Sequence, residues 1–257
     1  MHTSEYPPVA IELAAVAPVQ PAAPSAPQFG AKRALWIVAS YILTQLGIAG
    51  ALGGVFAVLQ QKSSVARVML IAVVAALAGC AIAWRMARRS FSGEPAHAFE
   101  DVLGVRPATQ RQLRLAVAVG FVLPVFNSLL LIRIFPPSST QELGPLVAAM
   151  AEGGWTRHVC AFFAICIAPP TEEFIFRGVL FAGLARRLSV PFAALISVVT
   201  FVGMHVNSPS PYWPALVAVA LLAVSAQIAR IRSGSLVPGI AMHTVYNALL
   251  FAFAYLG

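Results

Sequence analysis

Two carboxylates and a guanidinium stand inside an apolar run that is long enough to cross a membrane. The run extends from His158 to Leu184, and Glu172, Glu173 and Arg177 lie within it. A charged side chain near the centre of a membrane-spanning helix costs about 2.5–3.5 kcal/mol even on the lenient insertion scale. Such groups face a protein interior or a water-filled cavity, and by default they indicate function. We therefore expect a membrane helix whose polar residues form a site inside a bundle.

The spacing of these residues gives the two glutamates different roles. Glu173 and Arg177 are four residues apart, so on a helix they share a face and can form an ion pair. Glu172 lies about 100° around the helix from Glu173 and points elsewhere. We predict that Glu173 and Arg177 form a structural ion pair and that Glu172 is available for chemistry.

A double proline, Pro169-Pro170, comes directly before this group. Proline has no backbone N–H and disfavours helix in the residue before it. We therefore expect a kink, with both carboxylates in the first turn of a new half-helix, where the helix dipole favours negative charge.

The composition is that of an integral membrane protein. Apolar residues make up 59% of the 257 residues, charged residues 10%, and the mean hydropathy is +0.82. Windows of about twenty apolar residues predict an all-α polytopic bundle of about seven transmembrane helices, near residues 34–60, 65–84, 114–134, 158–184, 190–206, 212–229 and 236–256.

The domain organisation follows from the same pattern. Residues 1–31 are rich in proline and alanine without periodicity, which predicts a disordered cytosolic tail. Residues 32–257 form the membrane helical domain, and the polar residues fall in a core at about 114–257.

The basic residues report topology. With seven spans, twelve of the 17 Lys and Arg residues fall in loops on one side and four on the other, while Arg177 lies within the membrane. Positive loops stay in the cytoplasm, so the N-terminus is predicted to be cytoplasmic and the C-terminus outside. The net charge of +8 is thus explained without a nucleic-acid partner. The excess of arginine over lysine, with abundant alanine, is typical of a GC-rich bacterial genome and indicates a bacterial cell membrane.

Polar residues also occur inside two later spans. His205 ends the fifth span, and His243 and Asn247 share one face of the seventh. At about 1.5 Å per residue, His243, Asn247, Glu172 and His205 lie about 10, 16, 18 and 22 Å from the cytosolic ends of their helices. They therefore fall within a band of about 12 Å in a hydrocarbon core of about 30 Å. Each alone can be an interhelical hydrogen-bonding residue, but the shared depth favours an active site.

These side chains suit the attack of water on a carbonyl group. A carboxylate and a histidine can deprotonate a water molecule, and a histidine and an amide can donate hydrogen bonds to an oxyanion. A divalent metal such as zinc is the alternative water activator, with Glu172, His205 and His243 as its ligands. The sequence has no HExxH motif, so this choice stays open.

The three motifs together resemble those of the CAAX-processing and bacteriocin-processing (CPBP, or Abi) family of intramembrane endopeptidases, which includes the eukaryotic Ras-converting CAAX endopeptidase. The resemblance covers about 100–257. It is carried by Glu172-Glu173-x-x-x-Arg177, Phe201-x-x-x-His205 and His243-x-x-x-Asn247, and by the context Phe176-Arg177-Gly178 and Arg232-Ser233-Gly234-Ser235.

The resemblance implies a metalloprotease-like enzyme that cuts a membrane-associated peptide or protein. In such a family Glu172 and His205 would activate the water, His243 and Asn247 would stabilise the oxyanion, and Glu173 with Arg177 would be architectural.

Two functions from other classes compete with this interpretation. A non-catalytic membrane scaffold or bacteriocin-immunity protein would keep the fold, but it has no need for costly buried polar groups. A transporter would show an inverted repeat or polar groups staggered along a path, and neither is seen. The interpretation as an intramembrane endopeptidase is therefore preferred.

Overall fold

The computed structural model describes residues 29–59, 64–95, 97–137, 151, 153–206 and 212–256, and these residues form helices without strands. The predicted all-α architecture is thus confirmed. The expected tail at 1–31 lies outside the described residues except for 29–31. The first helix begins at Ala31.

The helices follow one another along the chain with few long connections. The N-terminal part holds α1 (Ala31–Val58), α2 (Val65–Arg89), α3 (Ala98–Leu103), α4 (Gln110–Phe126), the π-helix η1 (Asn127–Leu131) and α5 (Ile132–Ile134). The C-terminal part holds α7 (Gly154–Phe162), η2 (Phe163–Ile167), α8 (Ala168–Glu173), η3 (Phe174–Leu180), α9 (Phe181–Leu184), α10 (Val190–Gly203), α11 (Trp213–Ser233) and α12 (Val237–Leu256).

Six of the described helical segments are long and apolar enough to cross a membrane, as expected for an integral membrane protein. The fifth predicted span, α10, is shorter, with 14 residues. At about 1.5 Å per residue it extends about 21 Å, less than a hydrocarbon core of about 30 Å. His205 therefore follows the end of a short helix and lies in a turn.

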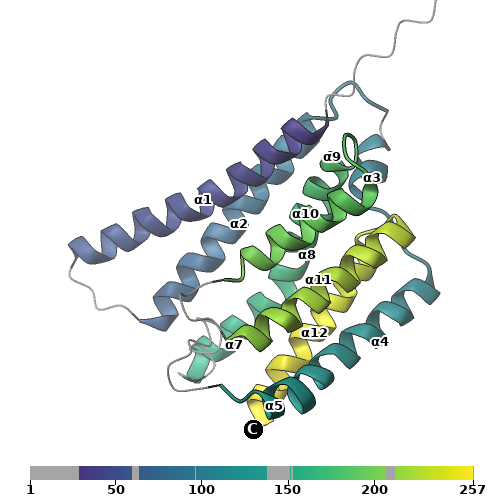
Figure 1. Ribbon diagram of the computed structural model, residues 1–257. Coiled ribbons are helices and arrows are strands. Elements are labelled where there is room, and N and C mark those ends of the chain that lie inside the picture. Colours follow the sequence, from purple (N-terminus) through teal and green to yellow (C-terminus); the bar gives the residue numbers. More distant parts are fainter. Residues whose placement is uncertain are drawn as a thin grey trace, which may run out of the picture.

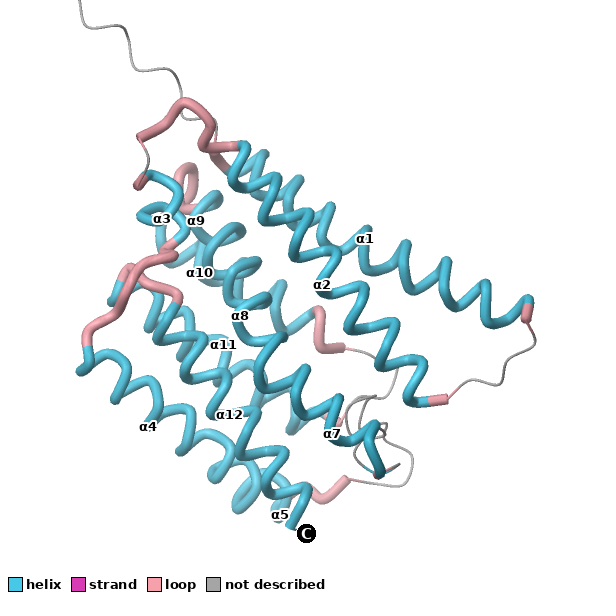
Figure 2. The backbone as a smooth tube through the Cα atoms, turned by 180° about the vertical axis from the view of Figure 1, so that it is seen from behind, coloured by secondary structure: helices cyan, strands magenta, loops and turns pink. Residues whose placement is uncertain are grey.

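The segment from Gly154 to Leu184, which carries Glu172 and is called here the motif helix, lies in the middle of the bundle. In Figures 1 and 2 it runs between the α1–α2 hairpin on one side and the group of α4, α11 and α12 on the other. The largest apolar core gathers residues of α1 and of the motif helix, among them Ile37, Tyr41, Ile175 and Val179. Most of the glutamate-bearing segment is thus buried among other helices.

Two glycines allow neighbouring helices to approach closely. A Cβ atom added at Gly120 of α4 would lie 2.5 Å from the Met242 carbonyl oxygen of α12. A Cβ atom at Gly183 of α9 would overlap the Ala34 side chain of α1. Because real side chains cannot approach so closely, glycine is required at both contacts.

The motif helix is continuous through the double proline, which differs from the new half-helix expected there. Two π-helical stretches, η2 and η3, flank the short α8, which itself begins just before Pro169. A π turn shifts the hydrogen-bond partner by one residue, so it can absorb the missing proline N–H groups without ending the helix. Glu172 and Glu173 consequently close α8 and do not lie in its first turn.

Candidate active site

A buried ion pair lies at the centre of the site. Arg177 Nη1 is 3.2 Å from Glu173 Oε1, and the two side chains are 0% and 1% exposed. The Arg177 guanidinium also donates from Nη2 to the Ala223 carbonyl of α11 at 3.0 Å and stacks 4.2 Å from the Phe201 ring centroid. The structure thus contains the Glu173–Arg177 pair that the spacing predicts.

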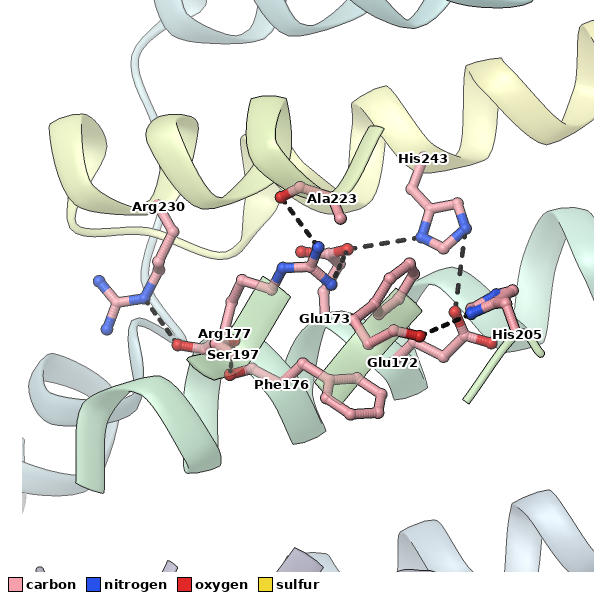
Figure 3. A network of polar contacts seen from close by, with 10 residues as sticks. Glu172, Glu173, Phe176, Arg177, Ser197, His205, Ala223, Arg230 and His243 are labelled. Carbon is pink, nitrogen blue, oxygen red and sulfur yellow. Dashed lines mark hydrogen bonds and ion pairs between the residues drawn. The ribbon is translucent and has the colours of Figure 1, made fainter. Parts of the chain in front are cut away.

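His243 of α12 lies between the two glutamates (Figure 3). Its Nδ1 is 3.4 Å from Glu173 Oε1, and its Nε2 is 4.0 Å from Glu172 Oε2. Because the Glu173 carboxylate can only accept a proton here, this contact favours Nδ1–H on His243 and directs Nε2 toward Glu172. Ion-pair contacts therefore connect four side chains in the order Arg177, Glu173, His243 and Glu172.

The Glu172 side chain is only partly buried. It is 23% exposed, in contrast to that of Glu173. Its buried Oε2 atom has no hydrogen-bond donor among the described residues. That Glu172 is available for chemistry stays a prediction, with which this placement is consistent.

His205 reaches the same region from the turn after α10. Its Nδ1 lies 2.8 Å from the Phe201 carbonyl oxygen, which can only accept, so Nδ1 carries the proton and Nε2 is left as the free ring nitrogen. The Phe201 ring contacts both imidazoles, with centroids 4.6 Å from His205 and 6.0 Å from His243. In the view of Figure 3 the His205 ring lies toward the Glu172 carboxylate.

Asn247 lies one turn beyond His243 on α12, but its amide contacts the backbone of the motif helix. Asn247 Nδ2 donates to the Ala164 carbonyl of η2 at 2.7 Å. At least one of its N–H groups is therefore already bound within the protein. The structure brings together Glu172, Glu173, Arg177, His205 and His243 and places Asn247 beside them as an interhelical contact.

The residues expected as zinc ligands do not gather into a metal site. Among the described residues, no three His, Cys, Asp or Glu side chains come close enough together to hold a metal ion. Glu172 and His243 are 4.0 Å apart at their nearest atoms. The Nδ1 atoms of both histidines are directed to protein acceptors, an arrangement that leaves Nε2 as the ring nitrogen for a metal or for water. As placed in the structure, the described side chains do not form a preformed three-ligand zinc site.

An apolar cavity of about 520 Å³ lies on another face of the motif helix. It extends between α2, the segment after α3 and the start of α12. Pro170, Thr171 and Phe174, which flank the two glutamates, form part of its wall. The other lining residues are Cys80, Trp84, Gly104, Val105, Arg106, Pro107, Leu236, Val237 and Ile240. Apolar groups can therefore bind in this cavity, whose wall includes residues next to Glu172 in the sequence.

Three features of the site were not predicted from the sequence. Glu173 contacts His243 as well as Arg177, the Phe201 ring lies against both histidines, and Gly239 is needed for α12 to approach. A Cβ atom at Gly239 would lie 2.8 Å from Glu173 Oε2. Phe201 is part of the motif Phe201-x-x-x-His205. The contacts of its ring depend on how α10 is rotated about its axis, which the sequence spacing does not specify.

Fold and site together define a polytopic helical membrane protein with a buried carboxylate–histidine centre. The model of the family described as "Rce1-like: Type II CAAX prenyl endopeptidase Rce1-like" matches residues 154–249, the part that contains all three motifs. Residues 154–249 are thus a domain of the CAAX-type intramembrane proteases, and the family resemblance of the sequence is confirmed there. Comparison with curated proteins and with solved structures finds no match.

Proposed function

We propose that this protein is an intramembrane endopeptidase that hydrolyses a peptide bond of a membrane-associated peptide or protein with water activated by Glu172 and His205. The observation that carries the proposal is the placement of Glu172. Its side chain is partly exposed, and its carboxylate oxygen Oε2 lies 4.0 Å from His243 Nε2, is buried, and has no hydrogen-bond donor among the described residues.

The reaction can be written with these side chains alone. Glu172 takes a proton from water while the water oxygen attacks the carbonyl carbon, and the free Nε2 of His205 accepts the second hydrogen bond of that water. The oxyanion of the tetrahedral intermediate accepts a hydrogen bond from Nε2–H of protonated His243. Glu172 then gives its proton to the leaving nitrogen, the C–N bond breaks, and a carboxylic acid and an amine are released.

Glu173 and Arg177 support this step without touching the substrate. Glu173 holds the His243 ring through Nδ1, and Arg177 compensates the charge of Glu173 in a region that water does not reach. A pre-oriented donor costs no reorganisation when negative charge develops. The ion pair therefore contributes both to stability and to the direction of His243.

The apolar cavity is an argument for a membrane-associated substrate. Its lining is almost entirely apolar, with Arg106 as the charged exception. A peptide whose side chains are apolar near the cut bond can place them there and remain partly in the lipid bilayer. We further propose the topology that the basic residues indicate, with a cytoplasmic N-terminus and an external C-terminus in a bacterial cell membrane.

The proposal is tested by mass spectrometry of membrane peptides from cells that express the wild-type protein or Glu172→Gln at matched levels. New peptide ends should appear with the wild-type protein and be missing with the variant. Identical peptide sets would favour the competing function of a non-catalytic scaffold or immunity protein.

A further inference from the structure

Asn247 contacts the motif helix at a point where the backbone lacks a donor. Within η2, the Ala168 N–H bonds to the Phe163 carbonyl, in the i to i−5 pattern of a π turn. In that pattern the next donor would be the N–H of residue 169, and its acceptor would be the Ala164 carbonyl. Residue 169 is proline and has no N–H. The α-pattern donor for the Ala164 carbonyl, the Ala168 N–H, is already bonded to Phe163, so this carbonyl is left without a backbone donor.

The side chain of Asn247 supplies the missing donor. Its Nδ2–H reaches the Ala164 carbonyl oxygen at 2.7 Å, across 83 residues of sequence. A carbonyl without a donor is costly in a membrane, because no water is present to replace it. The bond therefore fastens α12 to the motif helix two turns before Glu172.

Side chains of α10 and α11 bind the same helix further along. Ser197 Oγ donates to the Phe176 carbonyl at 2.9 Å, and Arg230 Nε donates to the Arg177 carbonyl at 3.3 Å. Asn247 is the contact of this kind nearest to the proline pair, and it comes from the helix that also carries His243. It is thus placed to fix the separation between Glu172 and His243.

We propose that Asn247 is a positioning residue, which holds the proline-containing part of the motif helix against α12 by replacing the N–H that Pro169 lacks, and that it does not serve as an oxyanion donor. The inference rests on the proposed function only for its catalytic consequence. The hydrogen bond and its structural effect stand whether or not the protein is a peptidase.

The test is a double-mutant cycle between Asn247→Ala and Pro169→Ala, with Pro170→Ala as the matched control. Alanine at position 169 restores a backbone N–H five residues after Ala164, where the π pattern needs a donor. If the helix changes to the α pattern, Ala168 provides the donor. Alanine at 170 restores a donor only for Ile165 or Cys166, whatever the pattern. Only the first substitution can therefore replace Asn247.

The first readout is the thermal unfolding temperature of purified protein in detergent, which needs no substrate. Asn247→Ala should lower it by about 2–10 °C. Adding Pro169→Ala should recover most of that loss, whereas adding Pro170→Ala should not. If both additions give the same unfolding temperature, the proposal is overturned.

The second readout is turnover of the fastest-cleaved peptide from the membrane-peptide experiment. A misplaced helix should lower kcat by about 10–100-fold with little change in KM, and Pro169→Ala should bring kcat back to within about threefold. An oxyanion donor would give a kcat loss that Pro169→Ala leaves unchanged, and this result would refute the positioning role. Wild-type protein that cleaves nothing would refute the proposed function but leave the unfolding cycle decisive.

If Pro169→Ala does not fold, Asn247→Leu and Asn247→Gln carry the test. Glutamine keeps an amide donor on a side chain that is one methylene longer, whereas leucine has a similar shape and no donor. The leucine variant should unfold at the lower temperature. Equal unfolding temperatures would contradict the proposal.

Discussion

Replacing Glu173 with glutamine should destabilise the protein strongly, because it leaves a buried guanidinium without its counter-charge. Arg177 is 0% exposed, and the nearest Glu173 oxygen lies 3.2 Å from its Nη1 atom. The remaining contacts of Arg177, to the Ala223 carbonyl and the Phe201 ring, carry no formal charge. Removing one partner of such a buried pair costs about 3–5 kcal/mol.

A matched control is available on the same protein. Arg88 and Glu100 form an ion pair at 3.4 Å with side chains that are 53% and 38% exposed. Such a pair contributes no more than about 1 kcal/mol, so Glu100→Gln should have little effect. Glu172→Gln serves as a second control, since Glu172 has no ion-pair partner as close as that of Glu173.

The assay is unfolding of the purified protein in mixed micelles, followed by helical circular dichroism against denaturing detergent. Glu173→Gln should unfold much earlier than both controls. Adding Arg177→Met to Glu173→Gln should recover part of the loss, because an apolar replacement removes the unpaired charge. If Glu173→Gln is as stable as Glu100→Gln, the reasoning about the buried pair is refuted.

Three further predictions concern packing, metal and topology. Gly120→Ala should lower the yield of folded protein, since its Cβ atom would lie 2.5 Å from the Met242 carbonyl oxygen. Gly50→Ala is the control and should not lower the yield, because no atom lies within 4 Å of a Cβ there. Equal yields of the two variants would contradict the close α4–α12 contact. Activity should survive exhaustive chelation, because the described residues form no three-ligand cluster; stoichiometric zinc that is lost in His243→Ala, measured by elemental analysis, would overturn the metal-free mechanism. A reporter fused after Gly257 should lie outside the cell and one before Lys32 in the cytoplasm, and a cytoplasmic C-terminus would show that the topology is wrong.

Much of the site could be predicted because helix geometry is local. Four-residue spacing predicts the Glu173–Arg177 pair, and counting residues from the helix ends places Glu172 and His243 within one band of depth. Apolar windows located the spans for the same reason. The end of the fifth span is less well predicted: apolar windows extend it to residue 206, whereas α10 ends at Gly203.

The remaining features depend on contacts between helices. The Glu173–His243 contact requires the close approach of α12 at Gly239, which no sequence spacing specifies. The π turns around α8 decide which carbonyls lack donors, and hence that Asn247 binds the Ala164 carbonyl. The sequence shows that Pro169 lacks an N–H and so leaves a carbonyl without a partner, but it does not show which side chain replaces that donor.

In the proposed mechanism Glu172 is the base that activates water for peptide hydrolysis. The most direct test is the initial cleavage rate of purified protein in lipid vesicles, with a peptide identified from the membrane-peptide experiment. Glu172→Gln should lower this rate by about 10²–10⁴-fold, the usual contribution of a general base, while its unfolding curve stays close to that of the wild type. A folded Glu172→Gln variant that cleaves the peptide at the wild-type rate would show that Glu172 is not the base.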